Sequence, residues 1–259
     1  MSEVFISHSH KDSRIALKIK NHLYQRFIVA FSYEADMKGG DIIWERINTG
    51  IRGGKYFMPL LSDHFVQSNP CMAELKTAWS IQQNRQLTII PILLADENKP
   101  NLTAVTESET QLLQTILQTV NYATFDKYNE EKSMQKVEDA IWSKEKVRFY
   151  PIEEKRIGLT NLQIIQFEMQ LGPDEKLPSD FLLNWDFDIR GFISESEKDD
   201  KPIKTNYPVA LNGKAPNWLF AYLALPFKNL RTVFLWNNVT KNYICIHSDD
   251  KEIPVGSAL

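Results

Sequence analysis

The sequence is poor in cysteine, in long apolar runs and in net charge of either sign. Its 259 residues include only two cysteines, Cys71 and Cys245, too few for a disulfide framework or a cysteine-rich zinc site, which favours a reducing compartment. The longest apolar run, 87–95, contains Thr88 and Pro91 and is far too short to span a membrane. With 30 Lys and Arg against 33 Asp and Glu, the net charge of −3 gives no reason to expect binding to long nucleic acids. The first residues lack the basic-then-apolar pattern of a signal peptide, so we expect a soluble cytoplasmic protein.

In the first half of the chain, short apolar runs alternate with amphipathic stretches. The pattern predicts strands at 3–7, 27–31, 55–61, 87–94 and 122–125, and helices at 12–25, 41–51, 71–83, 108–119 and 130–146. Continuous apolar strands separated by helices are typical of an α/β fold with a parallel sheet covered on both faces. Ligands on such sheets bind outside the carboxyl ends of the strands, which here fall at 7–8, 31–36 and 61–63.

The pattern changes after about residue 147, and a second, smaller α/β domain is predicted. Residues 161–171 alternate between apolar and polar, and further strands are expected at 186–193, 207–211, 232–236 and 243–247. A helix is expected at 215–225, with Pro216 near its start. The charged segment 194–204 is typical of a solvated loop. We place the boundary within 145–152, giving domains 1–147 and 148–259.

Three segments of the first half occur together in a recognisable order. They are VFISHSHKD at 4–12, DMKGGDII at 36–43 and NPCMAEL at 69–75, the last containing a Cys-x-x-Glu motif. Together they resemble the Toll/interleukin-1 receptor (TIR) family, in particular its NAD-cleaving members, over about residues 3–145. The resemblance implies a flavodoxin-like parallel sheet and an NAD glycohydrolase for which NAD⁺ is the substrate and no cofactor is needed.

The resemblance assigns the central catalytic role to Glu74 of the Cys-x-x-Glu motif. Cleaving the nicotinamide–ribose bond expels a neutral pyridine and leaves an oxocarbenium-like ribose, so one carboxylate that stabilises positive charge is sufficient. The further residues expected to contact NAD are Ser7, His8, Asp36, Trp44 and Cys71. An alternative role for Glu74 is to complement the helix dipole. Trp44 and Trp79 lie on expected helices, which favours packing roles, although either could also form a wall of the nicotinamide pocket. The spacing of His8, His10 and Asp12 is unlike that of metal ligands, so we predict no metal.

The segment VALNGKAPNWLFAYLA at 209–224 resembles a small CRISPR-associated ring-nuclease family that binds and degrades cyclic tetra-adenylate. The resemblance covers about residues 160–250 and implies ligand contacts in a turn before a helix. The residues concerned are Asn212, Gly213, Lys214, Asn217 and Trp218. Phe220 replaces the family's histidine, and 237–239 replaces an Asp-Pro-Arg-like turn, so we expect binding with reduced or absent hydrolysis.

Joined, the two resemblances predict an effector of type III CRISPR antiviral defence, in which cyclic tetra-adenylate activates a homo-oligomeric NAD hydrolase. Ligand-induced assembly would let the loop around 36–41 complete a neighbour's active site. Two other functions stay open at this point. One is a TIR scaffold without enzymatic activity, and the other is a ring nuclease that uses its TIR domain for oligomerisation alone.

Overall fold

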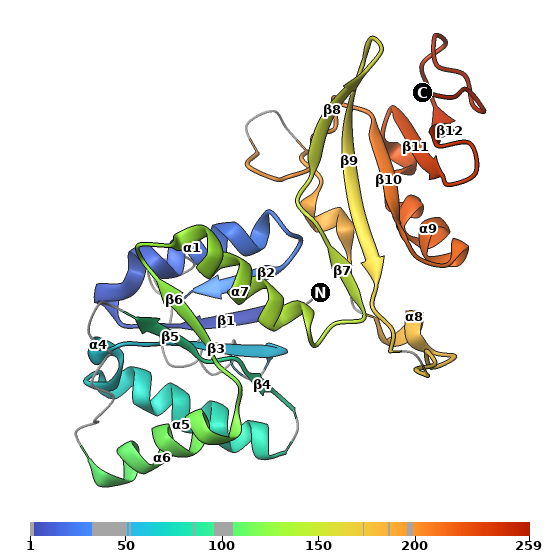
Figure 1. The fold of residues 1–259 in the computed structure, drawn as a ribbon. Helices are drawn as coiled ribbons and strands as arrows, with labels where there is room; N and C mark the ends of the chain where they lie inside the picture. The colour runs from blue at the N-terminus through green and yellow to red at the C-terminus, as the bar shows by residue number, and fades with distance from the viewer. Residues whose placement is uncertain are drawn as a thin grey trace. The chain divides into compact units, whose positions relative to one another are not determined.

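A computed structural model describes residues 3–32, 51, 53–84, 86–95, 106–172, 174–185, 187–195 and 199–259 (Figure 1). The chain divides into two compact units, one formed by Met1–Tyr24 with Ile28–Lys144 and the other by Gln25–Phe27 with Glu145–Leu259. Within the described ranges, no helix combines the length and the apolar composition needed to cross a bilayer.

The first unit contains a parallel sheet, as the alternation of apolar strands and helices predicts. Its strands are β1 (Glu3–Ser7), β2 (Val29–Ser32), β3 (Tyr56–Leu61), β4 (Thr88–Ile89), β5 (Ile92–Ala95) and β6 (Ala123–Asp126). They run in the order β2-β1-β3-β5-β6, with β4 pairing β3. All six residues of β3 are buried, as expected of a central strand covered on both faces.

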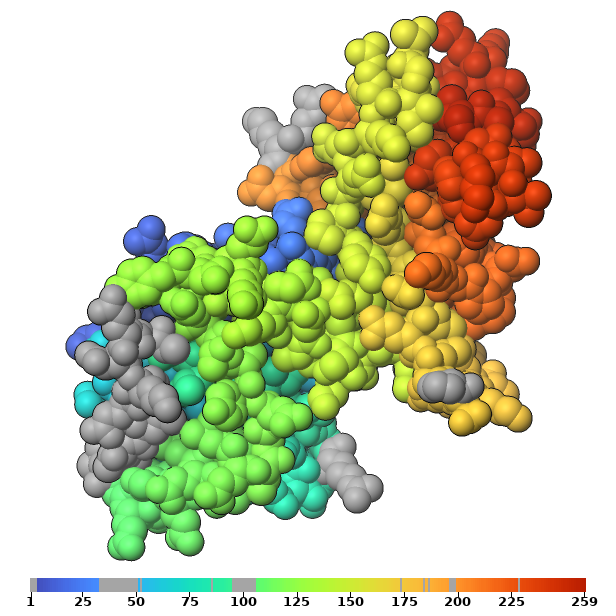
Figure 2. Space-filling view, viewed as in Figure 1, coloured from blue at the N-terminus to red at the C-terminus, as the bar shows by residue number. Residues whose placement is uncertain are grey.

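Helices cover the two faces of this sheet. They are α1 (Ser13–Tyr24), preceded by the 3-10 turn η1 (His10–Asp12), and α4 (Asp63–Val66), α5 (Asn69–Gln83), α6 (Glu107–Thr119) and α7 (Glu130–Trp142). Figure 1 shows α1 and α7 on one face and α5 and α6 on the other. In Figure 2, α6 and α7 (green) form much of the visible surface of this unit.

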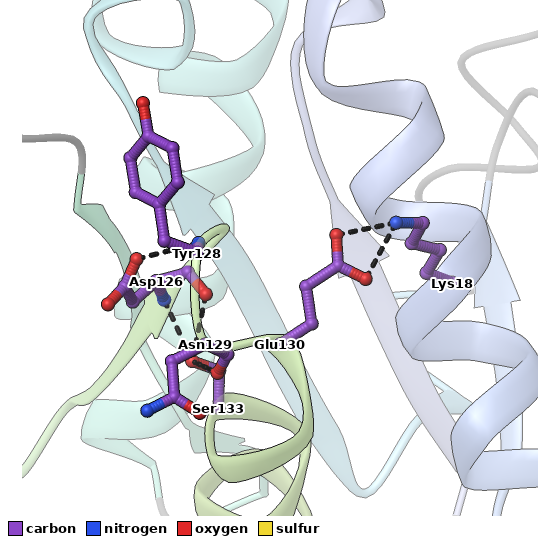
Figure 3. Close-up of polar contacts among 6 residues, drawn as sticks. All are labelled: Lys18, Asp126, Tyr128, Asn129, Glu130 and Ser133. Carbon is purple, nitrogen blue, oxygen red and sulfur yellow. Dashed lines mark hydrogen bonds and ion pairs between the residues drawn. The ribbon is translucent and has the colours of Figure 1, made fainter.

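The start of α7 illustrates how local polar contacts define these elements (Figure 3). The side chain of Asp126, at the end of β6, accepts a hydrogen bond from the backbone N–H of Tyr128 (2.8 Å). The Ser133 hydroxyl accepts another from the N–H of Asp126 (2.8 Å), which ties the strand end to the first turns of the helix. Lys18 of α1 contacts Glu130 of α7 at 2.5 Å, so the two helices are also joined directly.

Several predicted boundaries in the first unit differ from those observed. Phe27 adopts a left-handed backbone conformation with φ of 61°, so the second strand begins at Val29 instead of residue 27. The expected strand 87–94 is divided into β4 and β5, and Pro91, which cannot donate a backbone hydrogen bond, lies at the break. Helix α7 ends at Trp142, earlier than expected, and α4 was not predicted. Residues 41–50 of the expected helix 41–51 lie outside the described residues.

The second unit is built on a mixed sheet. Its strands are β7 (Val147–Phe149), β8 (Glu153–Ile157), β9 (Thr160–Met169), β10 (Val209–Lys214), β11 (Thr232–Asn237) and β12 (Asn242–Ser248). Strands β9, β10 and β11 are parallel neighbours, whereas β7, β8 and β12 pair antiparallel. The helical segments are α8 (Phe181–Asn184), η2 (Ile189–Phe192), α9 (Asn217–Ala224) and η3 (Leu225–Asn229).

Two predictions for the second unit need correction. The expected strand at 186–193 is wrong, because Ile189–Phe192 forms the 3-10 turn η2. Asp188 caps the start of this turn, since its side chain accepts a hydrogen bond from the backbone N–H of Arg190. Of the segment 161–171, only residues 161–169 are in a strand, β9, and burial does not alternate along it, since four consecutive residues, 162–165, are buried. Strands β7 and β8, which pair β9 on one side, were not predicted.

Candidate functional site

A group of buried polar side chains lies at the carboxyl ends of the central strands of the first unit. Ser7 ends β1, Ser32 ends β2 and Ser62 follows β3, and each is at most 8% exposed. Strand β1 pairs β2 on one side and β3 on the other, so these three positions are neighbours at one edge of the sheet. This is the edge at which parallel α/β sheets bind their ligands.

The contact at the centre of this group joins Ser7 to Glu74. The Ser7 hydroxyl donates a hydrogen bond of 2.5 Å to Oε2 of Glu74, and both residues are buried. Glu74 is placed there by α5, which begins after Ser68, whose hydroxyl accepts from the N–H of Cys71, and which has Pro70 in its first turn. The structure therefore brings the end of the first strand and the Cys-x-x-Glu helix to one point.

The environment of Glu74 disfavours its charged form. Burial raises the pKa of its carboxyl group from 4.5 to about 7, and the hydrogen bond from Ser7 opposes that rise. Glu74 is thus a buried carboxyl group with a pKa near neutrality that accepts one short hydrogen bond at the carboxyl ends of the strands. Perturbed carboxyl groups of this kind are typical of functional sites.

His8 follows Ser7 and is buried, and both of its ring nitrogens have hydrogen-bond partners. Nδ1 lies 3.0 Å from the carbonyl oxygen of Ser9, and Nε2 lies 2.9 Å from the hydroxyl of Ser32. Because a carbonyl only accepts, Nδ1 carries the proton, and in the neutral ring Nε2 accepts from the Ser32 hydroxyl. His8 therefore links the ends of β1 and β2.

Cys71 lies one helical turn before Glu74, and it is part of the apolar core between the sheet and α5. Burial raises the pKa of its thiol to about 12, and the nearby charges of Glu74 and Asp12 act in the same direction. The thiolate is the nucleophilic form of cysteine, so the environment suppresses nucleophilic chemistry at this position.

Sequence reasoning missed the pair formed by Ser62 and Asp12. The Ser62 hydroxyl donates to Oδ2 of Asp12 (2.6 Å) and accepts from the N–H of Phe65 (3.1 Å) as the N-cap of α4. This pair ties the loop after β1 to the loop after β3. The available signal was a serine placed directly after a buried strand and followed by a short helical turn.

Asp36 and Trp44, the other two residues expected to contact NAD, lie outside the described residues. Trp79 packs against the core between the sheet and α5, as expected of a packing residue. In the part of the chain that the structure describes, no group of three or more His, Cys, Asp or Glu residues is placed to hold a metal ion.

In the second unit, a cavity of about 330 Å³ brings together three of the predicted ligand contacts, Asn212, Gly213 and Lys214. Residues that sequence reasoning did not select complete its lining, namely Tyr150, Gln166, Phe167, Glu168 and Asn238. The Lys214 ammonium lies 3.7 Å from Oε1 of Glu168, whose Oε2 accepts from the Tyr150 hydroxyl (3.1 Å). Asn217 and Trp218 are not among the residues that line this cavity.

The turn expected at 212–214 is wrong, because these residues are the end of β10. They pair in parallel register with 166–168 of β9, and α9 begins only at Asn217, after Pro216. Gly213 is required by close packing, since a Cβ there would lie 2.1 Å from the carbonyl oxygen of Phe167. The cavity is therefore lined mainly by the ends of β9 and β10 and not by a helix N-terminus.

Phe220, which stands where the ring-nuclease family has histidine, packs against the ring of Phe167 with centroids 4.8 Å apart. Trp218 is 39% exposed, and its ring lies 6.2 Å from that of Phe181. Both aromatic side chains therefore have a ring neighbour inside the unit, and Trp218 is the more exposed of the two.

Comparison with known proteins supports the assignment of the first unit. The family model for the TIR domain matches residues 4–147. Among solved structures, the TIR domains of the activated Roq1 resistosome, which directly recognises the pathogen effector XopQ, share 18% identity, with 54% of this chain and 99% of that chain covered and a TM-score of 0.45. The TIR domain of the Toll-related receptor TRR-2 from Hydra magnipapillata shares 19% identity, with 54% and 92% covered and a TM-score of 0.34. No curated protein matches the chain. Because the family match spans more than half of the sequence, the chain belongs to the TIR domain family.

Proposed function

We propose that the first unit hydrolyses NAD⁺ to nicotinamide and ADP-ribose and that Glu74 is its catalytic carboxylate. The observation that carries the proposal is the buried Ser7–Glu74 hydrogen bond at the carboxyl end of β1. TIR domains include both enzymes and scaffolds, so the fold alone does not decide between them. A buried carboxyl group with a raised pKa at the ligand-binding edge favours the enzyme.

In the proposed reaction, the C1′–N bond of the nicotinamide riboside breaks and its electron pair leaves with the neutral pyridine. Positive charge develops on the ribose, and the ionised carboxylate of Glu74 stabilises it. Water then adds to C1′ and loses a proton, which gives ADP-ribose. Fixed electrostatic stabilisation of this kind, in a site shielded from water, contributes several kcal/mol to catalysis. The Ser7 hydroxyl favours the ionised form of Glu74 by donating to it.

We further propose that the second unit binds cyclic tetra-adenylate and that binding drives homo-oligomerisation and activation, as in a CRISPR-linked defence effector. Support comes from the resemblance at 209–224 and from the cavity that contains Asn212, Gly213 and Lys214. Lys214 offers a positive charge for a phosphate, because its side chain is 86% exposed. Phe220 provides no group that can transfer a proton, so the ligand is bound without being cleaved.

The experiment that tests the proposal is NAD⁺ consumption by the purified full-length protein, with and without a panel of cyclic oligo-adenylates of different ring size. We expect nicotinamide release that depends on one member of the panel. A scaffold without enzymatic activity would release no nicotinamide under any of these conditions, whatever ligand it binds.

A further inference from the structure

The second unit contains another cavity, of about 590 Å³, whose lining residues are all different from those of the cavity at Lys214. It is formed where the end of α9 and the turn η3 meet residues 185 and 187–190. Its volume lies within the range of about 300–1,000 Å³ that is typical of small-molecule sites. Neither the TIR assignment nor the proposed cyclic tetra-adenylate site accounts for it.

Three of the residues that line this cavity are aromatic. They are Trp185, Phe187 and Tyr222. The ring centroid of Trp185 lies 5.3 Å from that of Phe187 and 5.6 Å from that of Tyr222. Phe187 is buried in the core, whereas Trp185 and Tyr222 are only half-buried. The cavity therefore leaves aromatic surface accessible beside rings that are held in place by their neighbours. Such surface suits a flat heteroaromatic ligand.

Polar groups accompany these rings in the same cavity. Oδ1 of Asp188 accepts hydrogen bonds from Nε of Arg190 (2.9 Å) and from its backbone N–H (3.0 Å), which orients the arginine. A guanidinium carries five N–H donors, and the side-chain contact to Asp188 engages the one on Nε. The Arg190 side chain is 73% exposed, and the exposed Asn229 adds an amide that can both donate and accept.

We propose that this cavity binds a purine mononucleotide, with the base against Trp185 and Tyr222 and the phosphate on Arg190. Aromatic rings give affinity for any base, arginine matches a phosphate through paired hydrogen bonds, and an amide suits the polar edge of a purine. A purely apolar ligand would leave the guanidinium without a role, and an inorganic anion would leave the aromatic surface without one. The proposal is independent of NAD⁺ hydrolysis and of the cavity at Lys214.

Calorimetric titration of the full-length protein with AMP and with adenosine tests the site. We expect saturable binding of AMP and weaker binding of adenosine. Trp185→Leu should lower the affinity for both ligands by about 5- to 150-fold, as expected for a lost stacking contact. Arg190→Gln should lower the affinity for AMP by about tenfold or more and change the affinity for adenosine little, because the lost contact is to the phosphate.

Arg231→Gln is the matched control, since Arg231 is equally exposed at 71%, pairs with Asp250 in the same unit and does not line the cavity. It should leave both affinities unchanged. Tyr222→Leu provides a second aromatic variant if Trp185→Leu unfolds in a thermal melt. The proposal is overturned if the wild-type protein does not bind AMP, if Arg190→Gln binds it as the control does, or if Lys214→Glu alone abolishes binding. NAD⁺ hydrolysis is measured separately, so each of these failures is distinct from failure of the proposed function.

Discussion

The Ser7 hydroxyl donates a 2.5 Å hydrogen bond to Glu74, a residue 67 positions away along the chain. One residue ends the first strand of the sheet, and the other lies in α5, which follows the third strand. Both side chains are shielded from solvent, so the contact operates with little screening. It orients the carboxylate and favours its ionised form against the larger, opposite effect of burial, and the first three predictions concern this carboxylate.

Glu74→Gln keeps the size of the side chain and its ability to hydrogen-bond, but it removes the charge. We expect nicotinamide release to fall by about 10²- to 10³-fold, the loss typical of one transition-state stabiliser. Glu109→Gln is the matched control, because Glu109 is also a buried carboxyl group of the first unit but pairs with Lys76 and not with Ser7. Substantial NAD⁺ cleavage by Glu74→Gln would remove Glu74 from its role.

The pH dependence of kcat/KM should follow the ionisation of Glu74, since this parameter reports groups of the free enzyme. Burial holds the pKa of Glu74 at about 7, so activity should rise with pH and reach half of its plateau near that value. Ser7→Ala removes the donor that favours the charged carboxylate and should move the midpoint upward by about one to two pH units. A lower plateau with an unmoved midpoint would show that Ser7 acts by contact with substrate alone.

Stability should change with pH in the opposite sense from activity. The pKa of Glu74 is higher in the folded state than its usual value of 4.5, so its stabilising contribution is fully present below that value and is lost as pH rises through about 7. Between pH 4.5 and pH 8.5, the free energy of unfolding of Glu74→Gln should therefore rise by about 3 kcal/mol relative to that of the wild-type protein. Urea unfolding of both proteins across this range measures the difference. A difference that stays constant with pH would contradict the raised pKa.

Activity should depend on assembly. A ligand shifts an equilibrium only through its different affinity for the two states, so an activator that binds the second unit must favour a state in which the first unit is competent. We expect specific activity to rise with protein concentration, and the activated protein to sediment faster than the ligand-free form. Equal activity from a demonstrably monomeric sample would rule out control by oligomerisation.

Lys214→Glu should abolish activation by cyclic tetra-adenylate and leave the TIR unit folded, because it places a second carboxylate beside Glu168 in the cavity. Lys251→Glu, an exposed charge reversal away from the cavity, is the control. The wild-type protein should return the ligand unchanged after many NAD⁺ turnovers, as chromatography of the nucleotide can show. Rapid conversion to linear di-adenylate would mean that the absence of histidine at position 220 does not prevent cleavage.

The sequence by itself determined the class of the first unit and the identity of its candidate carboxylate. Continuous apolar strands separated by helices are typical of parallel sheets, and the Cys-x-x-Glu motif lies at the start of a helix whose cap and proline are local signals. These features depend on residues that are near one another in the chain. For the same reason, the main helices and most strands of both units were predicted within a few residues.

Only the tertiary structure decided which side chains meet. The contacts Ser7–Glu74, His8–Ser32 and Ser62–Asp12 join residues 67, 24 and 50 positions apart, and no local pattern reports such distances. The raised pKa of Glu74 follows from burial, which depends on the packing of the whole unit. In the second unit, the end of β10 resembled a turn because its glycine is a turn residue in most settings. There it is required instead by the carbonyl of Phe167, on a strand that lies more than forty residues earlier in the chain.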